Sequence, residues 1–210
     1  MKEICFIGDI HGCVEQLKEI FVAAAKRTQN FVFLGDYVNR GPSSRKVIDF
    51  LVELKSNEQL SATFLAGNHD TAFLQTLTSD GLDAFLLIGG AATIKSYVGT
   101  PKPDVLGQFR TAVPESHLRF LLDLDHKFVG DGIMAAHEPE PESAPGQTAV
   151  MSVFGHRPQP ELIPIIDDLH AYIDTGCGTL PNGRLTGFFW PSRDWIQSAT
   201  WDPHQAIDRI

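Results

Sequence analysis

Short apolar runs alternate with amphipathic segments through the first third of the chain. The runs 4–7, 31–34 and 62–65 are bounded by glycine, polar or charged residues, which is typical of strands. Over 14–26 and 44–54, apolar residues recur every three or four positions, as on the buried face of a helix. A third helical pattern follows residue 70. The order β-α-β-α-β-α predicts an α/β fold with a parallel sheet and helices packed on it.

The pattern changes between about residues 79 and 123. Two amphipathic segments there, separated from earlier apolar stretches by Gly89-Gly90 and Pro101-Lys102-Pro103, predict a small helical insert. Beyond it, apolar runs over 127–135, 150–154, 172–175, 185–190 and 195–198 predict a hairpin and further strands. We expect one domain over residues 1–210, with the insert forming a cap beside the site.

Polar side chains able to bind metal follow five of the predicted strands. In parallel sheets, ligands collect beyond the carboxyl ends of the strands, so these residues are expected to converge. Carboxylate, amide and imidazole groups are ligands for divalent cations. The residues are Asp9, His11, Asp36, Asn68, His69, His137 and His156. The remaining histidines lack a glycine-bracketed strand end and are expected at the surface or in ordinary hydrogen bonds: His117, His126, His170 and His204.

The composition limits the classes of partner. A formal net charge of −9 argues against a nucleic-acid groove, which needs a basic face. It remains compatible with a phosphorylated substrate, because bound cations would set the local field. The three cysteines are widely spaced and are expected to be reduced. No apolar run approaches membrane-spanning length and no signal peptide is evident, so we expect no membrane partner and a cytoplasmic location.

Three glycine-rich motifs carry a family resemblance. The segments Gly8-Asp9-Ile10-His11-Gly12, Gly35 to Gly41 and Gly67-Asn68-His69-Asp70, with His137 and Gly155-His156, resemble the signature of PPP-family metallophosphatases. Within that group, the chain resembles the bacterial and phage-type serine/threonine protein phosphatases. Their cap and closing segment are similar to Gly89-Gly90…Thr93…Ser96-Tyr97 and to 173–177. The resemblance implies the calcineurin-like metallophosphoesterase fold, a four-layer α-β-β-α sandwich.

The resemblance also implies roles for the polar residues. One cation would be held by Asp9, His11 and Asp36, and the second by Asp36, Asn68, His137 and His156. Two divalent cations, manganese first with iron, zinc, nickel or cobalt as alternatives, would share a hydroxide that attacks phosphorus. Arg40 would bind phosphate, and His69 would protonate the leaving oxygen.

This chain departs from the family pattern at three places. Asn39 stands where the family has an aspartate that pairs with the acid histidine. Asp70, which adjoins His69 in sequence, is the other carboxylate considered for that catalytic role. Residues 138–155 contain no arginine or lysine, although relatives carry a second phosphate-binding arginine there. Arg157 and Arg184 are the candidates to replace it. After His137, Glu138-Pro139 replaces the family's usual Ala-Gly and changes the loop that normally passes the substrate. The acidic stretch 138–142 would repel acidic phosphopeptides.

Three functions are therefore open from the sequence. The first is a metal-dependent phosphomonoesterase of the serine/threonine protein phosphatase type, acting on a phosphoprotein or a small phosphoester. The second is a hydrolase of dinucleoside polyphosphates such as diadenosine tetraphosphate, since related hydrolases share two of the motifs. The third is a catalytically weak metal-binding interaction protein. Pro158 stands where calcineurin-like phosphodiesterases usually carry a further histidine, which favours a phosphatase over a nuclease site.

Overall fold

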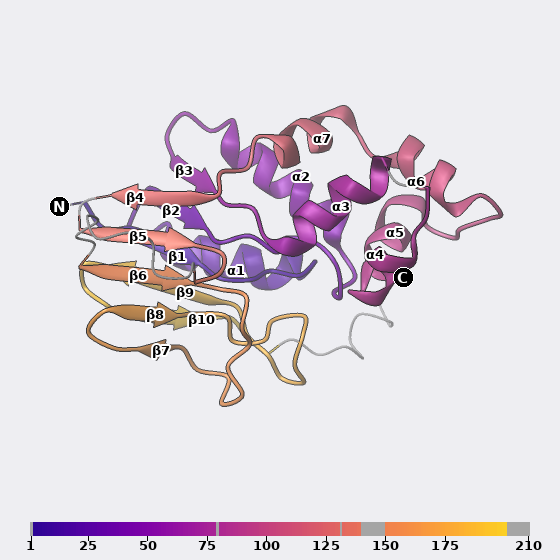
Figure 1. The fold of residues 1–210 in the computed structure, drawn as a ribbon. Helices are drawn as coiled ribbons and strands as arrows, with labels where there is room; N and C mark the ends of the chain where they lie inside the picture. Colours follow the sequence, from indigo (N-terminus) through magenta and orange to yellow (C-terminus); the bar gives the residue numbers. More distant parts are fainter. Residues whose placement is uncertain (1, 79, 131, 140–149, 201–210) are drawn as a thin grey trace.

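Two five-stranded sheets lie face to face in the computed structural model, which describes residues 2–78, 80–130, 132–139 and 150–200 (Figure 1). The first sheet has the order β10-β9-β1-β2-β3. Its centre is the parallel set β1 (Ile4–Ile7), β2 (Asn30–Phe33) and β3 (Ser61–Phe64). The antiparallel strands β9 (Thr186–Trp190) and β10 (Trp195–Gln197) extend it beyond β1. The three N-terminal strands predicted from sequence are confirmed.

The second sheet has the order β4-β5-β6-β8-β7. The hairpin β4 (Lys127–Gly130) and β5 (Ile133–Ala136) forms as predicted. The strands β5, β6 (Met151–Phe154) and β8 (His170–Tyr172) are parallel to one another, and β7 (Ile165–Ile166) pairs antiparallel with β8 at the edge.

Alternation along the strands produces two separate cores. In β1, Phe6 packs in the apolar layer between the two sheets, whereas Cys5 and Ile7 pack in the layer between the first sheet and the helices. Successive side chains of a strand point to opposite faces, so a continuous apolar strand fills both layers. The layer between the sheets fixes the strand ends of one sheet against those of the other.

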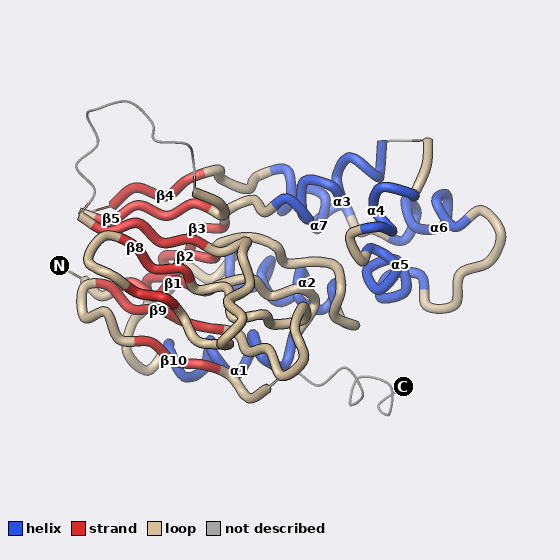
Figure 2. The backbone as a smooth tube through the Cα atoms, turned by 60° about the horizontal axis from the view of Figure 1, so that its bottom comes forward, coloured by secondary structure: helices blue, strands red, loops and turns tan. Residues whose placement is uncertain are grey.

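Helices cover the outer face of the first sheet. They are α1 (Val14–Ala24) and α2 (Ser44–Lys55), and α1 lies behind the strands in Figure 1. At one end of the sheets, α3 (Asn68–Thr78) meets four further helices (Figure 2). These are α4 (Asp83–Leu87), α5 (Gly90–Val98), α6 (Val105–Ala112) and α7 (Glu115–Leu122). They share a cluster of aromatic rings that includes Phe73, Phe85, Tyr97 and Phe109. The helices expected over 79–123 are thus present, and their action as a cap stays a prediction.

The outer face of the second sheet differs from the expected four-layer arrangement. From residue 127 onward, the described residues form strands, turns and loops, without a helix. The β6-to-β7 connection contains Pro158, Pro160 and Pro164, and proline does not fit a helix interior. The described part of the chain therefore forms an α-β-β arrangement within the calcineurin-like fold class, without the outer helical layer.

Candidate dinuclear metal site

The loops after the strands have unusual backbone conformations. His11, Asp36 and His156 have φ values of 44°, 52° and 69°, in the left-handed region that residues other than glycine seldom adopt. Such strained conformations persist only where the surrounding structure holds them in place, and they are common at functional sites. The close packing is clear at Gly67, where a Cβ would clash with Oδ1 of Asp36. The loops are therefore fitted closely around the Asp36 carboxylate.

Four oxygen and nitrogen atoms converge at the ends of β2, β3, β5 and β6. Nε2 of His137 lies 3.2 Å from Oδ1 of Asn68 and 3.4 Å from Oδ1 of Asp36. Nδ1 of His156 lies 3.1 Å from Oδ1 of Asn68 and 3.2 Å from Nε2 of His137. Atoms bound to one cation at about 2.1 Å would have similar separations. This is the set expected for the second cation.

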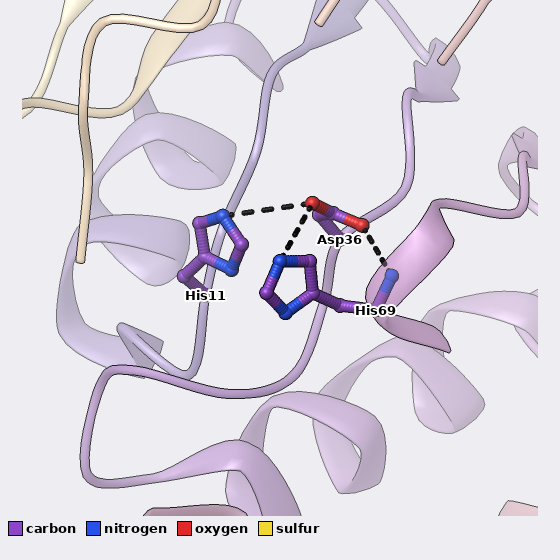
Figure 3. A group of neighbouring side chains, drawn as sticks. All are labelled: His11, Asp36 and His69. Atoms are coloured by element: carbon purple, nitrogen blue, oxygen red, sulfur yellow. Dashed lines mark hydrogen bonds and ion pairs between the residues drawn. The ribbon is translucent and has the colours of Figure 1, made fainter. Parts of the chain in front are cut away.

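The other oxygen of Asp36 faces a second group (Figure 3). Its Oδ2 lies 3.6 Å from Nε2 of His11 and 3.8 Å from Nε2 of His69, while its Oδ1 accepts a hydrogen bond from the backbone N–H of His69. Among the described residues, two groups of three side chains have ligand atoms within 4.8 Å of one another: His11, Asp36 and His69, and Asp36, His137 and His156. Asp36 is common to both, as a bridging ligand must be.

Asp9 lies beside these groups without belonging to either triplet. Both of its carboxylate oxygens accept a hydrogen bond from the backbone N–H of His156, at 3.2 and 3.1 Å. This contact joins the end of β1 to the end of β6 and so ties the two sheets together at the site. The expectation that Asp9 is a ligand of the first cation stays a prediction.

The donor groups suit divalent cations. Nδ1 of His11 donates to the carbonyl of Val38, and Nδ1 of His137 donates to the carbonyl of Leu34, both at 3.0 Å. In each ring this arrangement leaves Nε2 as the lone-pair nitrogen that a metal needs. Asp36, with two oxygens, and Asn68 supply the harder ligands. The residues present therefore fit two divalent cations.

Burial is the largest cause of the pKa shifts at the site. Burial raises the pKa of Asp36 to about 7, and burial raises the pKa of Asp9 well above its ordinary range, with the charge of Asp174 adding to the effect. Burial lowers the pKa of His137 to about 4 and that of His11 well below its ordinary value. The imidazoles are thus held neutral, which is the form that binds metal.

His69 and Arg40 form the opposite side of the site. Nη2 of Arg40 lies 3.3 Å from Nε2 of His69, and Nη1 of Arg40 donates to the hydroxyl of Thr179 at 2.8 Å. The backbone N–H of Arg40 donates to Gly89 at the start of α5, so the helical insert helps to position this arginine. Thr179 is a site residue that the sequence reasoning missed. Only its contact with Arg40, 139 residues away, reveals it.

The side-chain amide of Asn39 contacts His69, as its place in the family pattern suggested. Its Nδ2 lies 2.9 Å from Nδ1 of His69, and its Oδ1 accepts a hydrogen bond from the hydroxyl of Thr93 at 2.8 Å. The hydroxyl of Thr93 also accepts from the backbone N–H of Asn39. Thr93 belongs to a motif noted in the sequence, but its contact with Asn39 was not foreseen.

The carboxylate of Asp70 accepts hydrogen bonds from two backbone N–H groups, and its expected catalytic role stays a prediction. Its Oδ2 accepts a hydrogen bond from the backbone N–H of Gly67, and its Oδ1 accepts one from that of Tyr37. It is fully buried. The carboxylate thus fastens the loop after β2 to the loop after β3, and both of its oxygens are used by backbone rather than by His69.

The candidates for a second phosphate-binding arginine are both exposed. Burial lowers the pKa of His156, and the charges of His137 and Arg157 add to the effect, whereas the charge of Glu138 opposes it. The backbone N–H of Arg184 donates a hydrogen bond to the carbonyl of Thr175. Of the acidic stretch, Glu138 is described and its Oε2 lies 3.6 Å from Nε2 of His156, whereas Glu140 and Glu142 lie outside the described residues.

Of the histidines set apart in the sequence analysis, none that the structure describes belongs to either triplet. His117 is buried and bonds to Asp49 and Tyr97, so the expectation of an ordinary hydrogen bond holds and a surface position does not. His170 is partly exposed on β8, and His204 lies outside the described residues. His126 lines a cavity of about 550 Å³ beside the metal ligands Asn68 and His137. The three cysteines are buried and free, as expected.

A family model described as calcineurin-like phosphoesterase matches residues 2–163. The chain therefore belongs to the calcineurin-like phosphoesterase family, whose members use a dinuclear metal centre. In the described residues, no helix is long and apolar enough to cross a membrane.

Similar proteins carry phosphatase names. A Schizosaccharomyces pombe protein named "Putative serine/threonine-protein phosphatase C22H10.04" is 42% identical over 69 residues, covering 32% of this chain and 22% of that protein. "Serine/threonine-protein phosphatase PP2A-like PPG1" of Candida albicans is 39% identical over 74 residues, covering 35% of this chain and 18% of that protein. The match thus spans about a fifth of these relatives.

Solved structures share the fold over nearly the whole chain. A structure of a "putative diadenosine tetraphosphatase" has a TM-score of 0.61 and 21% identity, covering 96% of this chain and 95% of that one. A metallophosphoesterase from Sphaerobacter thermophilus has a TM-score of 0.58 and 16% identity, covering 96% and 88%. The fold of the calcineurin-like family is thereby confirmed.

Proposed function

We propose that this protein is a di-metal phosphomonoesterase of the serine/threonine protein phosphatase type. The observation that carries the proposal is the position of Asp36, whose Oδ1 faces His137 and whose Oδ2 faces His11. A carboxylate placed in this way can bridge two cations. Asp9 and His11 would complete the first position, and Asn68, His137 and His156 the second. We propose manganese as the cation and the cytoplasm as the location.

The cations supply Lewis acidity, which makes water nucleophilic near neutral pH and neutralises phosphoryl oxygens. The protein supplies phosphate binding and the proton for the leaving group. The Arg40 guanidinium, oriented by Thr179, offers two N–H groups to a phosphate in the forked geometry that suits two oxygens. His69 stands beside both Arg40 and Asp36, within reach of a leaving oxygen on a phosphate held there. Its role is to donate a proton to that oxygen.

Hydrolysis of a phosphoanhydride is the second candidate. The specific observation in its favour is that Asn39, an uncharged amide, stands against Nδ1 of His69. An amide orients the ring but stabilises its protonated form less than a carboxylate would. A phosphate leaving group needs less help from an acid than a serine or threonine alkoxide does. The diadenosine tetraphosphatase name of a similarly sized structural neighbour fits this candidate.

One experiment separates the candidates. The chelated protein is reconstituted with Mn²⁺, and separately with Fe²⁺, Zn²⁺, Ni²⁺ and Co²⁺, and is assayed on an aryl phosphate, a phosphothreonine peptide and diadenosine tetraphosphate. Turnover of the peptide above the dinucleotide supports the phosphatase, and the reverse order supports the anhydride hydrolase. No turnover with any cation, in protein that binds two of them, would support a metal-binding interaction protein. His170→Asn, away from the site on β8, is the control for His137→Asn, which we expect to be inactive.

A further inference from the structure

Asp174 is a buried carboxylate that the proposed mechanism leaves without a role. It follows the end of β8 and is 1% exposed. The backbone N–H of the preceding residue, Ile173, donates to Phe154 at the end of β6, two residues before the metal ligand His156. The carbonyl of Ile173 also lies against Gly8, where a Cβ would come within 2.8 Å of it. Asp174 therefore sits where the ends of β1, β6 and β8 meet.

The two oxygens of Asp174 are used differently. Oδ1 accepts a hydrogen bond from the backbone N–H of Gly176 at 2.9 Å, which holds the turn. Oδ2 is buried and has no hydrogen-bond partner, and it is the single side-chain atom of this kind among the residues described. Burying a carboxylate oxygen without a partner is costly, so such atoms in native proteins usually mark a missing water or ion.

The surroundings of Asp174 are acidic. Its charge contributes to raising the pKa of Asp9, second only to burial, and it also raises the pKa of Asp36. Burial raises the pKa of Asp174 itself to about 6, which the bond from Gly176 and the charge of Arg40 partly oppose. Three carboxylates in one buried region repel one another unless a cation lies near them. The two carboxylates whose pKa values Asp174 raises, Asp9 and Asp36, both belong to the first cation position proposed above.

We propose that Asp174 is a further residue of the metal site, whose Oδ2 accepts a hydrogen bond from water held by the cation at Asp9, His11 and Asp36. It is a positioning residue, because it acts through that water and through the charge it adds. The inference rests on the proposed function, since it requires the chain to bind two cations. A purely structural role, in which Asp174 only holds the turn through Gly176, is the competing explanation.

The substitution Asp174→Asn tests the two roles against each other. The amide oxygen can still accept from Gly176, so the turn is kept, while one negative charge and one acceptor are lost. We expect the weaker of the two Mn²⁺ affinities, measured by titration calorimetry on the chelated full-length chain, to fall about 10–100-fold, as for other residues that support metal ligands. The thermal midpoint in chelator at pH 7.5 should rise, because a buried repulsion has been removed. A purely structural role predicts unchanged affinities, because the amide oxygen keeps the bond from Gly176.

Controls keep the outcomes distinct. Asp123→Asn removes the same charge from an exposed position that pairs with Lys55, and it should change neither affinity nor midpoint. Should Asp174→Asn fail to fold, Asp174→Ser keeps one oxygen for Gly176 and undergoes the same titration. If the parent chain binds two Mn²⁺ ions and the folded variant binds both as tightly, the inference is overturned while the proposed function stands. If the parent chain binds no Mn²⁺, both are overturned.

Discussion

The side-chain amide nitrogen of Asn39 lies 2.9 Å from Nδ1 of His69, in a buried contact between the loop after β2 and the first turn of α3. Burial lowers the pKa of His69 to about 4, with the charge of Arg40 adding to the effect. Near neutral pH the ring is therefore uncharged, and its neighbour offers no negative charge to favour protonation. This pair sets how strong an acid the site can offer to a leaving group.

Replacing Asn39 with aspartate should improve the hydrolysis of esters with poor leaving groups. The carboxylate would stabilise protonated His69, and general-acid catalysis contributes about 10²–10⁴-fold in enzymes that use it fully. We expect kcat on an alkyl phosphate to rise at least about tenfold, with little change on p-nitrophenyl phosphate, whose leaving group needs no proton. The measurement is kcat across a series of phosphate esters whose leaving groups differ in pKa.

Asn57→Asp is the matched control, since it makes the same chemical change at an exposed turn after α2. For this variant, the slope of log kcat against leaving-group pKa should be the same as for the parent chain. An unchanged slope in Asn39→Asp as well would show that His69 does not act on the leaving group.

Removing the guanidinium of Arg40 should weaken phosphate binding in both ground and transition states. For Arg40→Ala we expect kcat/KM to fall by about 10²–10³-fold, the range for losing a preorganised donor. Thr179→Val removes the hydroxyl that orients the guanidinium and should cost about 2–10-fold, the value of one hydrogen bond. Inhibition by inorganic phosphate should weaken in the same order.

Arg45→Ala removes an equal charge from the exposed first turn of α2, where Arg45 lies over the ring of Tyr97. Its kcat/KM should stay within about twofold of the parent, since exposed charges contribute little. If Arg45→Ala and Arg40→Ala reduced kcat/KM equally, a general loss of positive charge would explain the effect better than a specific phosphate contact.

The residues at strand ends were predictable because they depend on local sequence. Parallel strands deliver their carboxyl ends to one edge of a sheet, so an apolar run followed by Asp36 or by Asn68 and His69 already specifies where those side chains lie. The structure shows this convergence for His11, Asp36, His137 and His156. Helix ends were less certain. The first helix stops at Ala24 rather than Lys26 because a stripe of apolar residues does not mark the last turn.

The supporting residues were not predictable, because their partners are distant in sequence. Thr93 reaches Asn39 across 54 residues, and Thr179 reaches Arg40 across 139. Hydroxyl groups are common in helices and turns, and only the folded chain shows which ones contact the site. Asp174 is similar: the sequence places it in an apolar run expected to be a strand, and only the folded chain shows that its Oδ2 is buried without a hydrogen-bond partner.

His117 should matter for stability rather than for catalysis. Its Nε2 bonds to Asp49 of α2 and its Nδ1 to the hydroxyl of Tyr97 of α5, both at 2.8 Å, so it joins three helices. His117→Ala leaves a cavity and a buried hydroxyl without a partner, and should lower the free energy of unfolding by about 2–4 kcal/mol. Urea denaturation measures this, with the partly exposed His170→Ala as control. Loss of metal binding at temperatures where the variant is folded would contradict a purely structural role.

The stability of the chelated protein should fall as pH rises from about 6.5 to 8. Burial raises the folded-state pKa of Asp36 to about 7 and the pKa values of Asp9 and Asp70 well above their ordinary range, whereas unfolded aspartate has a pKa of about 3.9. In this window the folded state binds more protons than the unfolded state, so raising the pH favours unfolding.

Below about pH 6.5 the histidines act in the opposite direction, because burial lowers the pKa of His11 and His137 while unfolded histidine takes up protons. Saturating Mn²⁺ should remove the fall, since cations bind the deprotonated carboxylates. Thermal midpoints at pH 6.5, 7.2 and 8.0, in chelator and in Mn²⁺, measure both effects, and Asp36→Asn should flatten the curve in chelator. A midpoint in chelator that stays level or rises over this range would show that these carboxylates are already ionised in the folded protein.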